Sequence, residues 1–124
     1  MIRPAARGQV LVVDDSADTR ALLSGYLREV GYQASAAADG QQALHMLRGG
    51  LAPSAIVYDA AEPSMGGRAF VEQMRAGPNA APVLLMTAAR GAGSEGADAA
   101  IAKPFQLIDF GDKLLRLLRE HTTR

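Results

Sequence analysis

The chain has 124 residues, no cysteine, and thirteen basic residues that balance thirteen acidic ones. This length fits one domain with a buried core, and the lack of cysteine excludes a disulfide framework and a thiolate zinc site. The balanced charge gives no electrostatic case for nucleic acid or an anionic membrane, and the longest nearly apolar run, residues 80–89, is half a membrane span. Because the start of the chain is no signal peptide, we expect a soluble cytoplasmic protein.

Short apolar runs alternate with amphipathic segments along the chain. The first predicted strand covers residues 10–13, and the first helix covers 16–30 and ends at Gly31. The later predicted elements follow in order: strand 32–36, helix 39–48, strand 55–58, helix 68–75, strand 82–86, strand 99–102 and helix 106–120. Strands that alternate with helices predict a doubly wound α/β fold with a five-stranded parallel sheet covered on both faces.

Residues 88–98 depart from this alternation. They contain Gly91, Gly93 and Gly96, and the low helix propensity of glycine disfavours a long helix there. We therefore expect the fourth of the usual five helices to be short or missing.

Charged or hydroxyl-bearing residues follow four of the predicted strands: Asp14 and Asp15, Asp59, Thr87, and Lys103. The carboxyl ends of parallel strands meet at one edge of the sheet, where such folds bind ligands. Three carboxylates and one ammonium leave an excess of negative charge, which a hard divalent cation such as Mg²⁺ would complement. A metal beside a carboxylate, a lysine and a hydroxyl is a set of groups suited to phosphoryl transfer, and Asp59 would be the nucleophile.

Each of these residues also has an ordinary structural interpretation. Asp14, Asp15 or Ser16 could cap the first helix, and Asp59 could cap a turn. Lys103 could simply be the residue that follows the last strand. What favours a functional interpretation is that all of them occur in the correct order on one edge of the sheet.

At this point the sequence resembles the receiver domain of two-component response regulators. Four segments carry the resemblance: VLVVDDS at 10–16, IVYDAAEPSMGG at 56–67, LLMTA at 84–88 and AKPF at 102–105. The resemblance implies a single receiver domain over 1–124 with its core at about 9–119. It also implies a flavodoxin-like fold with strand order 2-1-3-4-5 and a cis peptide bond before Pro104.

The resemblance further implies a role for each site residue. Asp59 would be the phosphoacceptor, Thr87 would bind and report the phosphoryl group, and Lys103 would pair with a phosphate oxygen. Two alanines would contact the bound group, namely Ala60 and, through its amide, Ala88. The Mg²⁺ ligands would be Asp15, Asp59, the carbonyl of Ala61 and, through water, Asp14.

Four positions depart from the family pattern, and two of them, Ala61 and Ala89, stand where relatives often carry polar side chains. Glu62 stands where methionine is usual, which places an extra carboxylate near the predicted metal. Ile101 sits where a switching aromatic residue is common, so we hypothesise that the glycine-containing loop at 88–96 is the switch instead.

The implied function is that of a phosphoacceptor which takes a phosphoryl group from a histidine kinase or histidine phosphotransferase and passes its state to an unidentified downstream protein. It would bind neither nucleic acid nor membrane through this domain, and it would catalyse only its own phosphorylation and dephosphorylation. One alternative is a phosphorylation-independent protein-binding module. Another is an aspartyl-phosphate hydrolase, which Ala61 disfavours because it replaces the second acid of that class. The sequence leaves open whether the chain is complete or part of a longer protein.

Overall fold

The computed structural model describes residues 7–88 and 96–122, which form one sheet with helices on both faces. Five parallel strands lie in the order β2-β1-β3-β4-β5, as predicted. The strands are β1 (Gln9–Val13), β2 (Gln33–Ala37), β3 (Ala55–Asp59), β4 (Val83–Thr87) and β5 (Ala99–Ala102). The helices are α1 (Ala17–Glu29), α2 (Gly40–Arg48), α3 (Gly67–Ala76) and α4 (Leu107–Thr122).

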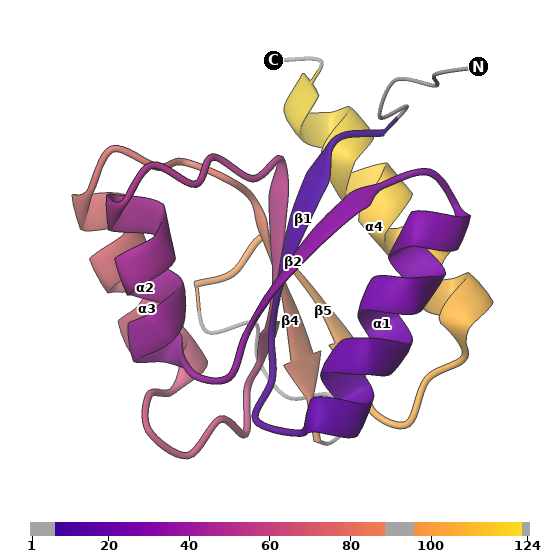
Figure 1. Ribbon diagram of the computed structural model, residues 1–124, viewed down its shortest axis with the longest axis horizontal. Coiled ribbons are helices and arrows are strands. Elements are labelled where there is room, and N and C mark those ends of the chain that lie inside the picture. The colour runs from indigo at the N-terminus through magenta and orange to yellow at the C-terminus, as the bar shows by residue number, and fades with distance from the viewer. Residues whose placement is uncertain (1–6, 89–95, 123–124) are drawn as a thin grey trace.

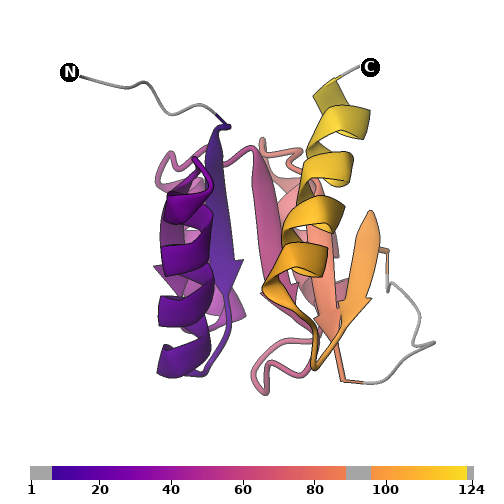
Figure 2. The same ribbon diagram turned by 90° about the vertical axis from the view of Figure 1, so that its right-hand side faces the viewer.

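The helices form two layers, one on each side of the sheet. In Figure 1, α2 and α3 lie together on one side of the strands, and α1 and α4 lie on the other. Figure 2 shows α1 and α4 side by side in front of the sheet, with the strand arrowheads pointing toward one end of the molecule. Every strand therefore ends at the same edge.

Alternation along the buried strands supplies both halves of the core. In β1, Leu11 and Val13 pack toward α2 and α3, whereas Val10 and Val12 pack toward α1 and α4. The central strand β3 is buried at all five positions. Continuous apolar strands of this kind are typical of a parallel sheet that is covered on both faces, which is the property that the sequence pattern predicts.

The ends of α1 show how local sequence sets an element. Ser16 is the N-cap, and its hydroxyl accepts a hydrogen bond from the Thr19 amide at 3.2 Å. After the helix, Gly31 adopts a φ of 103°, a left-handed conformation that glycine reaches without steric cost. The capping interpretation of Ser16 is thus confirmed, and the Ser16 amide in turn donates to Oδ1 of Asp14 at 2.9 Å.

The connection between β4 and β5 contains no helix in its described residues, 88 and 96–98. Residues 89–95 lie outside the described residues, and with them most of the loop that we hypothesised to switch. At the near end of β5, Arg75 of α3 donates to the Gly96 carbonyl at 3.1 Å and pairs with Asp98 at 2.9 Å. These contacts fix the return of the chain into β5.

A core truncation tests this packing. Leu114 lies in α4 with no exposed surface, whereas Leu22 of α1 is 57% exposed. We expect Leu114→Ala to lower the free energy of unfolding by about 2–5 kcal/mol, because it removes buried methyl groups and leaves a cavity. The matched control Leu22→Ala should change it by less than about 0.5 kcal/mol. Urea unfolding of both variants measures this, and equal effects would contradict the described burial.

Candidate functional site

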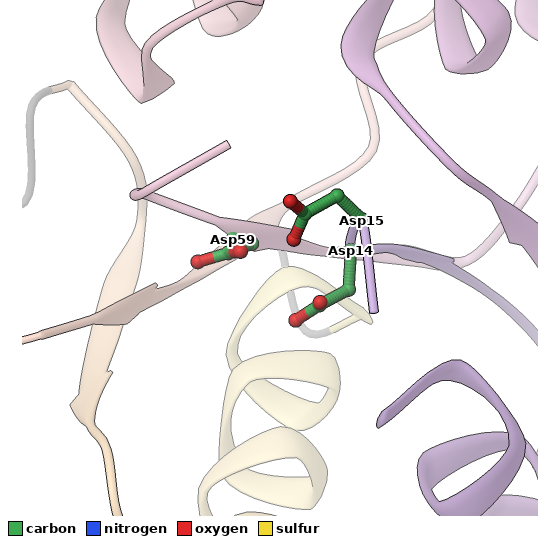
Figure 3. Close-up of side chains that lie close together, drawn as sticks. All are labelled: Asp14, Asp15 and Asp59. Atoms are coloured by element: carbon green, nitrogen blue, oxygen red, sulfur yellow. The ribbon is translucent and has the colours of Figure 1, made fainter. Parts of the chain in front are cut away.

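Three carboxylates meet at the carboxyl edge of the sheet. Asp14 and Asp15 directly follow β1, and Asp59 ends the neighbouring strand β3. One carboxylate oxygen from each residue lies within 4.8 Å of the other two, and Figure 3 shows the three side chains gathered there. The structure thus brings together the acidic residues that the sequence predicted, although Asp15 and Asp59 are 44 positions apart in the sequence.

Lys103 compensates part of this negative charge. Its Nζ lies 2.9 Å from Oδ2 of Asp14 and 3.6 Å from Oδ1 of Asp59. Asp14 is 1% exposed and Asp59 is 5% exposed, so both carboxylates depend on such partners rather than on water. The peptide bond between Lys103 and Pro104 is cis, as the resemblance implies.

Sequence reasoning missed a second basic residue at this edge. Arg20 of α1 donates from Nη1 to the backbone carbonyl of Asp14 at 2.8 Å. Its position six residues after Asp14, in the second turn of the following helix, is the signal that could have found it. The contact fixes the backbone that carries the acidic pair.

The surroundings of Asp59 make its ionised form less favourable than it is in water. Burial raises the pKa of the Asp59 carboxyl group, and the negative charges of Asp14 and Asp15 raise it further. The amide of Ala61, which donates to Oδ1 of Asp59 at 3.0 Å, and the charge of Lys103 only partly offset these effects. An added positive charge nearby would therefore stabilise the ionised form of Asp59.

Thr87 and the loop after β3 complete the edge. Thr87 is buried and donates from Oγ1 to the Ile101 carbonyl at 3.4 Å. The amide of Ala60 donates to the Met86 carbonyl at 2.8 Å, so this amide is already bonded in the structure. Ala88 is exposed and lines a groove beside Lys103.

The donor set suits Mg²⁺. The candidate ligands are carboxylate oxygens, of which those of Asp14 and Asp59 are buried and that of Asp15 is exposed to solvent. A bound ion could therefore keep several water molecules. Mg²⁺ characteristically binds through one or two carboxylates together with water and phosphate oxygens. The residues present therefore fit the metal that the sequence predicted.

Glu62 does not join the acidic cluster. Its carboxylate is 4% exposed, accepts hydrogen bonds from Ser64 and Gly40, and lies 3.3 Å from the Tyr58 hydroxyl. The expectation of an extra carboxylate near the metal is therefore wrong, because the side chain reaches toward the start of α2 instead.

Ile101 is also placed differently from the expectation. It pairs with Met86 in the register of β4 and β5, and both side chains pack in the core beneath α1 and α4. Strand alternation puts Thr87 on the opposite face, which is also the face of Ala100. Ile101 therefore cannot follow a movement of the Thr87 side chain.

The fold and this site define a class of protein: a doubly wound α/β domain with an acidic, lysine-paired site at the carboxyl edge of its sheet. The sequence pattern of the response regulator receiver domain matches residues 10–115. The chain belongs to this family. Receiver domains of response regulators interact with histidine kinases and are generally not classical enzymes.

Relatives agree with this assignment. The transcriptional regulatory protein PrrA of Mycobacterium leprae is 39% identical over 117 residues, which cover 90% of this chain and 50% of PrrA. The regulator of RpoS of Escherichia coli is 35% identical over 88 residues, or 71% of this chain and 26% of that protein. The chain thus spans half or less of the length of these relatives.

Solved structures share the fold. The chemotaxis response regulator CheY4 of Vibrio cholerae has a TM-score of 0.82 and 29% identity, with 90% of this chain and 99% of CheY4 covered. The receiver domain of the sensor histidine kinase PA1611 from Pseudomonas aeruginosa, solved with a magnesium ion coordinated in its active site cleft, has a TM-score of 0.81 and 26% identity, with 91% and 98% covered.

The raised pKa of Asp59 predicts how pH affects stability. Because the folded protein binds this proton more tightly than the unfolded chain does, ionising Asp59 destabilises the fold as pH rises through the folded pKa. Without divalent cations, Asp59→Asn should therefore melt at a higher temperature than the parent protein at pH 7, and the difference should vanish below the ordinary carboxyl pKa. Thermal melting across pH measures this. The exposed control Asp112→Asn should show no such trend, and a destabilised Asp59→Asn would refute the assigned burial cost.

Proposed function

We propose that Asp59 accepts a phosphoryl group from the phosphohistidine of a histidine kinase or histidine phosphotransferase. The observation that carries the proposal is the burial of Asp59 within 4.8 Å of two other carboxylates and 3.6 Å from Lys103. An Oδ of Asp59 forms the new P–O bond as the P–N bond of the donor breaks, and the departing imidazole takes up a proton. Lys103 then pairs with a phosphoryl oxygen, and Thr87 contacts another.

Asp15, Asp59 and the Ala61 carbonyl would hold Mg²⁺ directly, and Asp14 would hold it through water. The metal would neutralise the charge of the carboxylates and of the incoming phosphoryl group, which is the main requirement of this reaction. The magnesium ion of the PA1611 receiver domain supports this assignment, because that domain shares the fold.

An apolar groove beside the acceptor suits a protein partner. It has a volume of about 560 Å³ and is lined by Thr19, Leu22, Leu23, Ala88, Lys103, Pro104, Phe105 and Leu107. Leu22 on α1 and Ile108 on α4 are the exposed large hydrophobic side chains of the described chain. A phosphohistidine presented on a protein surface could therefore reach Asp59 while its carrier covers these side chains.

No helix in the described part of the chain has the length and apolar character required to cross a bilayer. The cytoplasmic location that is general for response regulators is proposed for this chain too. The family match favours the phosphoacceptor over the protein-binding module and the hydrolase.

The decisive experiment is labelling with acetyl phosphate and Mg²⁺, followed by intact mass. The parent protein should gain one phosphoryl group, and Asp59→Asn should gain none, because the amide keeps the shape of the side chain but lacks the nucleophile. The control Asp112→Asn should label like the parent protein. Labelling that persists in Asp59→Asn would place the acceptor elsewhere, and an unlabelled parent protein would favour the protein-binding module.

Metal binding is tested separately by calorimetric titration. We expect Asp15→Asn to weaken Mg²⁺ binding at least tenfold, since it removes a charged oxygen ligand of a weakly chelated ion. Asp18→Asn, which removes an exposed carboxylate from the first turn of α1, serves as the control and should bind like the parent protein. Equal affinities for all three proteins would rule out Asp15 as a ligand.

A further inference from the structure

Glu62 is a buried carboxylate that the proposed reaction does not use. It lies in the loop between β3 and α3, three residues after Asp59, and is 4% exposed. Ser64 donates its amide to Oε1 at 3.0 Å and its hydroxyl at 2.8 Å, and the Gly40 amide lies 3.4 Å from Oε2. All these donors are neutral, so hydrogen bonding alone must offset the cost of burying the charge. Burial opposes ionisation, yet these hydrogen bonds hold the pKa of Glu62 below its ordinary value.

The carboxylate meets the beginning of α2. Asp39 is the N-cap of this nine-residue helix, and Gly40 is its first residue. A negative charge is favourable there because the first amides of a helix have no partner within it. Gly40 also makes the approach possible, since a Cβ at this position would lie 2.5 Å from the Tyr58 hydroxyl and 3.2 Å from the Cβ of Met65.

Tyr58 joins the same contacts from the strand. Its hydroxyl donates to the Met65 carbonyl at 2.7 Å and lies 3.3 Å from Oε2 of Glu62. Its ring stacks on Phe70 of α3 with centroids 4.2 Å apart. The loop is therefore held at two points, Glu62 and Met65, by a rigid side chain that immediately precedes the acceptor.

These contacts bear directly on the site. The Glu62 amide donates to the Asp59 carbonyl at 3.1 Å, and the Ala61 amide donates to the Asp59 carboxylate at 3.0 Å. The peptide groups between Asp59 and Glu62 thus form one turn that ends at the anchored carboxylate. A rotation of Glu62 out of its pocket would move the Ala61 peptide.

We propose that Glu62 is a positioning residue: by anchoring the loop after β3 to the start of α2, it sets the orientation of the Ala61 peptide and of the Asp59 carboxylate. The inference rests on the proposed function for the identity of the metal and of the acceptor. The role differs from that of a metal ligand, because Glu62 acts through the backbone and its own oxygens are occupied by Ser64, Tyr58 and Gly40.

The test compares Glu62→Gln with Glu72→Gln, which removes an exposed carboxylate from α3. Without Mg²⁺, Glu62→Gln should speed amide exchange at Gly40, Ala61 and Ser64, because one acceptor oxygen becomes a donor. In calorimetric titrations it should weaken Mg²⁺ binding about tenfold, the usual cost of losing a residue that orients a ligand. Acetyl phosphate labelling should need correspondingly more Mg²⁺ but reach the parent rate at saturation. Glu72→Gln should match the parent protein throughout.

A Glu62→Gln protein with a lower melting temperature but parental Mg²⁺ affinity would overturn the inference, since Glu62 would then support only the fold. Tyr58→Phe is the second variant: it keeps the ring stacked on Phe70, removes the hydroxyl, and should also weaken Mg²⁺ binding. Parental affinity in both variants would refute the anchoring role. If the parent protein binds Mg²⁺ but is not labelled, the proposed function fails while the positioning role is still decided by the metal titrations.

Discussion

The mutual repulsion of Asp14, Asp15 and Asp59 is the constraint on which the rest of the site depends. Two of these carboxylates are almost fully buried, and Lys103 supplies one positive charge against three negative ones. This edge of the sheet is therefore short of positive charge. An added cation would therefore be favourable at this edge.

The parallel sheet supplies the rigidity that holds such an arrangement together. β1 and β3 are neighbours with a continuous ladder, so Asp14 and Asp59 emerge side by side without relying on loop conformation. β4 and β5 bring Thr87 and Lys103 to the same edge, where the Lys103 amide donates to the Thr87 carbonyl at 2.7 Å. The cores on both faces of the sheet keep these strands from shifting relative to one another.

The structure shows the local surroundings of Glu62 and of the β5 residues near Thr87. Glu62 accepts hydrogen bonds from neutral donors, the Gly40 amide at the start of α2 and Ser64 in its own loop, and it is not part of the acidic cluster. Ala100 occupies the face of β5 that Thr87 shares, where its side chain is too small to fill a space that the threonine vacates. An aromatic switch through these β5 positions is therefore excluded by side-chain size and strand alternation.

The sequence by itself determined the order of the helices and strands, and it identified the five charged or hydroxyl-bearing residues at the ends of the strands. It could do so because the spacing of apolar residues, the turn residues and the residues that follow each strand are local properties of the chain. Helix and strand ends shifted by only one or two residues. Only the tertiary structure decided where Glu62 and Ile101 point and which amides are already bonded, as at Ala60. The direction of a side chain depends on strand register and on partners distant in the sequence, such as Gly40 for Glu62, and these contacts exist only once the sheet and helices have packed.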